Sequence, residues 1–94
     1  MKIRWTRLAR KDIDSAYEYV ADDGAGVADQ LIERIQQAAA ILVRHPMAGR
    51  TGRIPGTREL VVPDTPWILA YRIRRGFVDI LGVIHGARKW PDDL

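Results

Sequence analysis

The sequence predicts a single α+β domain in which a helical hairpin packs on one face of a small antiparallel β-sheet. Two stretches with apolar residues at helical spacing fill the first half of the chain. Three strand-like runs, separated by turn signals, fill the second half. Helices and strands that are segregated along a chain in this way favour helices on one face of an antiparallel sheet. With 94 residues, of which 47% are hydrophobic, we expect one domain spanning residues 1–94 with one modest core.

The first half begins with a short expected strand at Lys2–Trp5, and Thr6 is the predicted N-cap of the first helix. Helical spacing in this helix is carried by Ala9, Ile13, Ala16, Tyr17 and Val20. Asp22, Asp23 and two glycines then break it. The second helix has its predicted apolar face at Val27, Leu31, Ile35, Ala38, Ala39 and Leu42. It ends at His45-Pro46, because proline disfavours a helical conformation in the residue before it.

A Gly/Pro-containing loop is predicted at Met47–Thr57, and three strands follow it. The expected strands are Arg58–Val62, Trp67–Arg74 and Phe77–Ile84. Arg75-Gly76 separates the last two as a tight hairpin turn.

A regular two-residue hairpin pairs Arg74 with Phe77 and Arg72 with Asp79, which is a favourable cross-strand charge pair. Alternation then puts His85 on the same, more polar face as Arg72. The opposite face is almost wholly apolar, so it is expected to lie under the helices. This assignment of faces depends on the register, because a slip of one residue reverses it.

Several classes of protein are disfavoured by composition. The chain has no cysteine, and its two histidines are far apart, so we expect no disulfide, no metal and no cofactor. No apolar run approaches the ~20 residues that a membrane-spanning helix needs. The N-terminus lacks the apolar segment of a signal peptide. We therefore expect a cytoplasmic protein without a membrane association.

Charge is segregated along the chain. Between Asp12 and Glu33 there are seven carboxylates and no lysine or arginine, whereas Arg44 to Lys89 holds nine cations against three carboxylates. Eight of these nine cations are arginine, which suits bidentate contacts with phosphate or carboxylate. The basic half is therefore expected to meet an anionic partner, although an ordinary solvated surface would show the same composition.

The last predicted strand runs into ILGVIHGARKWP, which carries a cluster of candidate functional residues. His85 could act as an acid or base or donate to a phosphate. Arg88 and Lys89 follow a glycine that permits close approach of an anion. Trp90 could stack on a base. The alternatives are a strand-end histidine bonded to backbone, two solvated cations and an aromatic side chain that packs on the core.

The loop arginines form a second candidate surface. Arg50, Arg53 and Arg58 surround the glycine-bearing loop, and Arg74 ends the second of the three expected strands. The loop lacks the Gly-Lys-Ser/Thr ending of a P-loop. These arginines are therefore predicted contacts to nucleic acid or to an acidic protein target.

Taken together, the segments PMAGRTGRIPGTREL, WILAYRI and VDILGVIHGARKWP resemble the RelE/ParE superfamily of type II toxin–antitoxin toxins. The resemblance covers essentially the whole chain. It implies a helical hairpin on an antiparallel sheet, in agreement with the periodicity. It also implies a toxin that arrests growth and an antitoxin partner whose acidic or amphipathic segment wraps it.

Two activities follow from this resemblance. RelE-like members are ribosome-dependent mRNA endonucleases, and in such a protein Arg88, His85 and Arg72 would be the catalytic set, stabilising the charge of the transition state. ParE-like members instead inhibit DNA gyrase. RelE-like nucleases usually carry an arginine three residues before the tyrosine of the third strand, where this chain has Ile68, and their C-terminal tyrosine is absent here. These departures favour DNA gyrase as the target of the toxin over the ribosome and its mRNA. A non-toxic basic interaction domain is the third reading.

Overall fold

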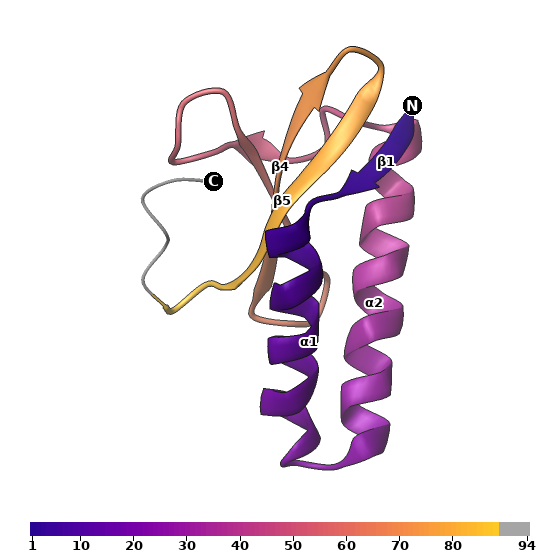
Figure 1. Ribbon diagram of the computed structural model, residues 1–94, viewed down its shortest axis with the longest axis vertical. Helices are drawn as coiled ribbons and strands as arrows, with labels where there is room; N and C mark the ends of the chain where they lie inside the picture. The colour runs from indigo at the N-terminus through magenta and orange to yellow at the C-terminus, as the bar shows by residue number, and fades with distance from the viewer. Residues whose placement is uncertain (89–94) are drawn as a thin grey trace.

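The computed structural model describes residues 1–88, and its element order confirms the α+β class. Strand β1 (Lys2–Trp5) precedes the two helices, α1 (Arg7–Ala21) and α2 (Ala25–Arg44). The remaining strands are β2 (Arg50–Thr51), β3 (Arg58–Val61), β4 (Trp67–Arg74) and β5 (Phe77–His85). The β4–β5 turn and the α1–α2 connection lie at opposite ends of the molecule (Figure 1).

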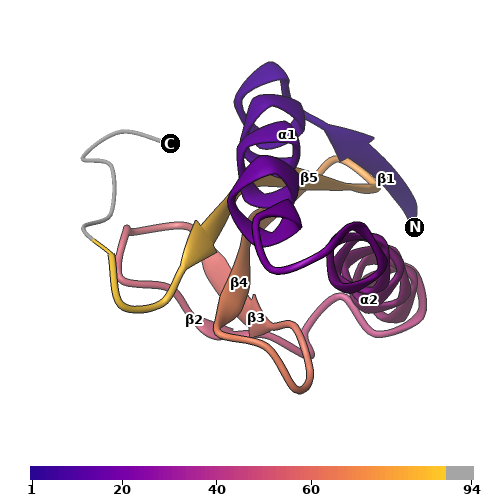
Figure 2. The ribbon, with the colours of Figure 1, turned by 90° about the horizontal axis from the view of Figure 1, so that it is seen from below.

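The five strands form one sheet in the order β1-β5-β4-β3-β2, with both helices on one side of it (Figure 2). The expected antiparallel sheet is formed by β2 to β5, and the N-terminal strand β1 adds a parallel pair beside β5. The parallel pairing of β1 with β5 is possible because the chain between them is long and includes both helices and strands β2 to β4. The sheet is therefore mixed.

The helices begin and end close to the predicted positions. Thr6 caps α1, because its hydroxyl oxygen accepts a hydrogen bond from the amide of Ala9 at 3.2 Å. The predicted apolar face of α2 is confirmed except at Val27, which is 49% exposed, while Ala28 takes the buried position beside it. Leu31, Ile35 and Leu42 pack against the sheet in the main core.

The segment Met47–Thr57 is not entirely loop, because Arg50–Thr51 forms the edge strand β2 beside β3. The hairpin turn was predicted correctly: Arg75 and Gly76 both have positive φ, at 51° and 83°, which suits a two-residue turn. The main core lies between the helices and the sheet, and Tyr71 is its largest fully buried side chain.

Candidate functional site

An irregularity in the β4–β5 hairpin decides where the predicted site residues lie. Near the turn the register is as expected, with Arg72 opposite Asp79 and Tyr71 opposite Ile80. Beyond it Ala70 faces Gly82, so Leu81 is one additional residue on β5. Such a β-bulge reverses the faces of all residues that follow it on the strand.

The bulge overturns the prediction that His85 and Arg72 share a face. His85 pairs with Trp67, a residue of the helix-side core, and its ring lies edge-on to the Trp67 ring at 5.2 Å. Arg72 alternates with Tyr71 and Ile73, which face the helices, so it lies on the open face of the sheet. The three residues of the predicted catalytic set are therefore divided between the two faces.

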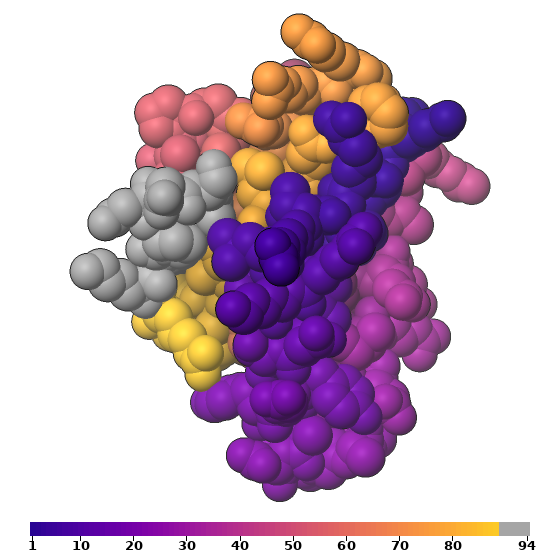
Figure 3. All heavy atoms as spheres, in the orientation of Figure 1, coloured from indigo at the N-terminus to yellow at the C-terminus, as the bar shows by residue number. Residues whose placement is uncertain are grey.

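His85 and Arg88 lie together in a cleft of about 210 Å³ between α1 and the end of β5. His85 Nδ1 accepts a hydrogen bond from the amide of Ala87 at 3.1 Å, so the neutral imidazole carries its proton on Nε2. The Arg88 guanidinium lies 4.6 Å from the centre of the Tyr19 ring in a cation–π contact. In the space-filling view the turn after β5 lies against α1 (Figure 3).

Asp12 of α1 also lines this cleft, and sequence reasoning missed it. Its Oδ2 accepts a hydrogen bond from the amide of Val83 at 2.9 Å, just beyond the bulge. Burial raises the pKa of Asp12, and the hydrogen bond from Val83 opposes this shift in part. The carboxylate thus joins α1 to the irregular part of β5.

The open face of the sheet carries a second group of charges. Asp79 is buried, and its carboxylate accepts two hydrogen bonds from Arg4 of β1, at 2.6 and 3.1 Å. These bonds hold the pKa of Asp79 below its usual range. Arg72 lies opposite Asp79 as predicted, and its buried Nε has no hydrogen-bond partner within residues 1–88.

The structure places the predicted loop arginines on both sides of the sheet. Arg50 and Arg53 both contact the buried carboxylate of Glu59, which faces Ala70 on the open side of the sheet. Arg58 instead donates to the carbonyl oxygen of Gly49 at 2.8 Å. It lies across from Tyr71, on the helix side, so it supports the fold at the start of β3.

The remaining predicted contacts lie apart from these clusters. Arg74 is exposed at the β4 end of the hairpin turn. Lys89 and Trp90 lie outside the described residues. Within residues 1–88 no three His, Asp or Glu side chains come together in a way that could hold a metal ion.

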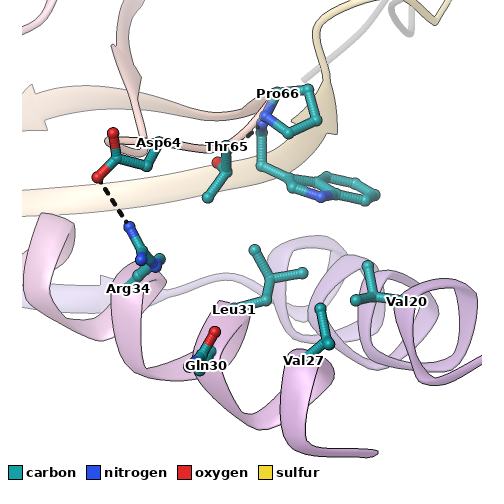
Figure 4. Close-up of a pocket in the computed structure, with 9 residues that line it drawn as sticks. Val20, Val27, Gln30, Leu31, Arg34, Asp64, Thr65 and Pro66 are labelled. Atoms are coloured by element: carbon teal, nitrogen blue, oxygen red, sulfur yellow. Dashed lines mark hydrogen bonds and ion pairs between the residues drawn. The ribbon is translucent and has the colours of Figure 1, made fainter. Parts of the chain in front are cut away.

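A groove of about 230 Å³ separates α2 from the β3–β4 connection (Figure 4). Val27 and Leu31 point into it from α2, and Val20 reaches it from α1. Arg34 closes one side, because its guanidinium bonds to Asp64 at 3.0 Å. This apolar groove was not predicted, since it depends on the exposure of Val27 and on the course of the β3–β4 connection. The part of the chain that the structure describes holds no helix long and apolar enough to cross a membrane.

Comparison with known proteins gives consistent matches over the whole fold. Residues 3–90 match the family model for the ParE toxin of the type II toxin–antitoxin system parDE. A Sinorhizobium fredii protein named "Putative toxin Y4kP" is 42% identical over 93 residues, which is 99% of this chain and 96% of that protein. "Toxin RelE2" of Caulobacter vibrioides is 30% identical over 87 residues, covering 93% and 97% of the two chains.

A solved structure is similar as well. A chain from the chromosomal ParDE TA system of P. aeruginosa matches with a TM-score of 0.82 and 27% identity. The match covers 90% of this chain and 95% of that chain. The mixed sheet and the helical hairpin are therefore shared with a toxin–antitoxin structure.

Proposed function

Because the chain belongs to the ParE toxin family of type II toxin–antitoxin systems, we propose that it arrests bacterial growth by inhibiting DNA gyrase. Membership of this family implies an antitoxin partner that neutralises the toxin. We further propose that both act in the bacterial cytoplasm.

The observation that supports gyrase over mRNA is the division of the predicted catalytic set by the bulge at Leu81. A nuclease needs its general base and its phosphate-stabilising cations within reach of one phosphodiester group. Here His85 lies in the cleft beside α1, and Arg72 lies on the other face of the sheet. These two side chains are not arranged to act on the same phosphate, so inhibition by binding to a protein target fits this geometry better than RNA cleavage.

A RelE-like mRNA endonuclease is the second candidate, and two observations favour it. One relative carries the name RelE2, and the open face presents Arg72 with a buried Nε that lacks a partner among the described residues. In that case cleavage would depend on Arg72 and its neighbours on the open face, without His85.

The test is a supercoiling assay with purified DNA gyrase, relaxed plasmid, ATP and the isolated toxin. We expect wild-type toxin to abolish supercoiling and His85→Ala to retain most of this inhibition. In parallel, ribosomes translating a defined mRNA should leave that mRNA intact. Full gyrase activity together with codon-spaced mRNA cuts would replace the proposal with the endonuclease. Full gyrase activity with intact mRNA would leave the non-toxic interaction domain.

A further inference from the structure

The cleft between α1 and the end of β5 combines apolar walls with two opposite charges. Asp12 lies on its α1 side, and Arg88 comes from the turn that follows β5. The apolar side chains that line it are Leu8, Ala16, Trp67, Val83 and Ile84. Its volume of about 210 Å³ is that of about seven water molecules, so it has room for a ligand of roughly seven to ten non-hydrogen atoms.

The two charges lie toward opposite ends of the cleft and do not neutralise each other. The Arg88 guanidinium lies over the Tyr19 ring, and Tyr19 follows Asp12 by seven residues on α1. Seven residues of α-helix span about 10 Å along the helix axis. Although both side chains line the cleft, no ion pair joins Asp12 to Arg88 in the described part of the chain. Each charge is therefore available to a ligand.

Asp12 offers a partly buried carboxylate with one oxygen unused. Oδ2 accepts a hydrogen bond from the Val83 amide at 2.9 Å, and Oδ1 has no hydrogen-bond partner among residues 1–88. The burial that raises the pKa of Asp12 penalises its charged form, so a cationic group of a ligand would offset this cost. Ser15 also lines the cleft, one turn further along α1, and adds a hydroxyl oxygen. This end of the cleft is suited to an ammonium group, which has three donors.

Arg88 and His85 form the end that suits an anion. The cation–π contact with Tyr19 positions the Arg88 guanidinium without neutralising its charge. His85 Nδ1 accepts from the Ala87 amide, which leaves the proton on Nε2 for a ligand. A guanidinium beside an imidazole N–H is suited to binding a carboxylate.

We propose that this cleft binds a free α-amino acid with an apolar side chain, such as leucine, with its ammonium group on Asp12 and its carboxylate on Arg88 and His85. Hydrogen bonds of about 2.8 Å at each end, and the ~3 Å between ammonium nitrogen and carboxylate oxygen in the ligand, give a span of about 9 Å. This span is close to the ~10 Å between the two ends of the cleft. The proposal rests on the cleft alone and goes beyond the inhibition of gyrase.

A zwitterion fits this cleft better than an ion of one sign. A simple carboxylate would leave the Asp12 charge without a partner, and a simple amine would do the same to Arg88. General attraction to a chain of net charge +3 would instead favour any anion over a zwitterion. The preference among charged forms of one ligand therefore distinguishes a specific site from general attraction.

The test titrates L-leucine into the isotope-labelled full chain and follows its amide NMR signals. The Val83 and Ala87 amides are the reporters, because they donate to side chains that line the cleft. We expect both signals to shift and to saturate with a Kd of about 1 mM. N-acetyl-L-leucine lacks the ammonium group and L-leucinamide lacks the carboxylate, so each should bind at least about tenfold more weakly.

Two outcomes of this titration would overturn the proposal. One is that both reporter signals stay unchanged up to about 20 mM L-leucine. The other is that N-acetyl-L-leucine binds as tightly as L-leucine, which is the result that general attraction to a basic chain predicts.

Asp12→Asn removes the charge that holds the ammonium group at nearly unchanged shape, and should weaken leucine binding at least about tenfold. The matched control is Asp14→Asn, which changes an exposed carboxylate of α1 outside the cleft and should stay within about twofold of wild type. If Asp12→Asn fails to fold, Ser15→Leu fills the cleft from an exposed position and should abolish the shifts. Leucine binding at wild-type affinity in either cleft variant would contradict the proposal.

Arg88→Gln tests the opposite end of the cleft. It should lose the preference for L-leucine over L-leucinamide, whereas Arg75→Gln, in the turn at the other end of β5, should keep it. A preference retained by Arg88→Gln would show that the carboxylate is not bound as proposed. None of these measurements uses gyrase, so the amino-acid cleft and the proposed inhibition of gyrase can fail independently of each other.

Discussion

Tyr71 shows at the residue scale how the chain holds the segment that follows α2. Its buried hydroxyl donates to the carbonyl oxygen of Pro46 at 2.7 Å and accepts from the amide of Gly49 at 2.9 Å. Burial raises the pKa of this hydroxyl, and the hydrogen bond from Gly49 opposes the shift in part. A Cβ atom at Gly49 would lie 2.6 Å from the hydroxyl oxygen, so glycine is required at this position.

Tyr71→Phe should therefore lower the free energy of unfolding by about 1–3 kcal/mol, because two backbone groups lose their partner in a buried site. Urea denaturation followed by circular dichroism measures this difference. The control is Tyr17→Phe, which removes an exposed hydrogen bond to Asp29 and should cost less than about 0.5 kcal/mol. Equal effects of the two variants would show that the buried hydroxyl is not what holds the loop.

Asp79 should make stability fall in acid. The hydrogen bonds from Arg4 lower the pKa of Asp79 in the folded protein, so the unfolded chain binds its proton more tightly. The contribution is complete above the unfolded pKa of about 4 and is lost as pH falls through the lower, folded value. Thermal unfolding should thus show a larger fall in Tm for wild type than for Asp79→Asn between about pH 5 and pH 3.

Wild type must be compared with Asp79→Asn because protonation of Asp12 changes the stability in the opposite direction. Burial raises the pKa of Asp12, so its protonation favours the folded state as pH falls. Asp12 is unchanged in both proteins, and its effect cancels in the difference. Parallel Tm curves for wild type and Asp79→Asn would contradict the role of the Arg4–Asp79 pair.

At the scale of secondary-structure elements, the junction between β1 and α1 depends on one side chain. The Thr6 hydroxyl accepts from the amide of Ala9 at 3.2 Å and donates to the carbonyl oxygen of Ile80 at 2.8 Å. It therefore caps α1 and ties the start of the helix to β5.

Thr6→Ala should lower the free energy of unfolding by about 1–2 kcal/mol, since it removes the helix cap and the bond to β5 together. Thr6→Ser keeps the hydroxyl and should stay within about 0.5 kcal/mol of wild type. Chemical denaturation of the three proteins measures both differences. A Ser variant as unstable as the Ala variant would show that the methyl group, and not the cap, is what matters.

Elements with strong local signals could be predicted from the sequence, and those set by distant contacts could not. Thr6, Pro46 and the Arg75-Gly76 turn mark element ends through their own backbone chemistry, so those ends were found. The parallel direction of β1 is decided by pairing with β5, which a four-residue strand cannot reveal. The short edge strand β2 was hidden inside a loop signal for the same reason.

The candidate site was limited by the bulge. A single additional residue at Leu81 has no signal in a run of apolar residues, yet it decides on which face His85 lies. The pairing of Arg72 with Asp79 was predicted correctly because it lies on the regular side of the bulge. The contact between Glu59 and Arg50 could not be predicted, because it depends on β2, which was expected to be part of a loop.

At the scale of the whole molecule, the two faces of the sheet have different roles. The helix side holds the core and the cleft with His85 and Arg88, and the open side holds arginines over buried carboxylates. The seven acidic residues between 12 and 33 all belong to the helical hairpin, which also carries cations at the start of α1 and on α2.

The most direct test of this account is to induce the chain alone in bacteria and compare mRNA 5′ ends, mapped by primer extension, with DNA cleavage trapped on gyrase. Growth arrest with intact mRNA and trapped gyrase–DNA complexes is the predicted result, and His85→Ala should still arrest growth. New mRNA ends in register with codons, abolished by Arg72→Ala or His85→Ala, would contradict it.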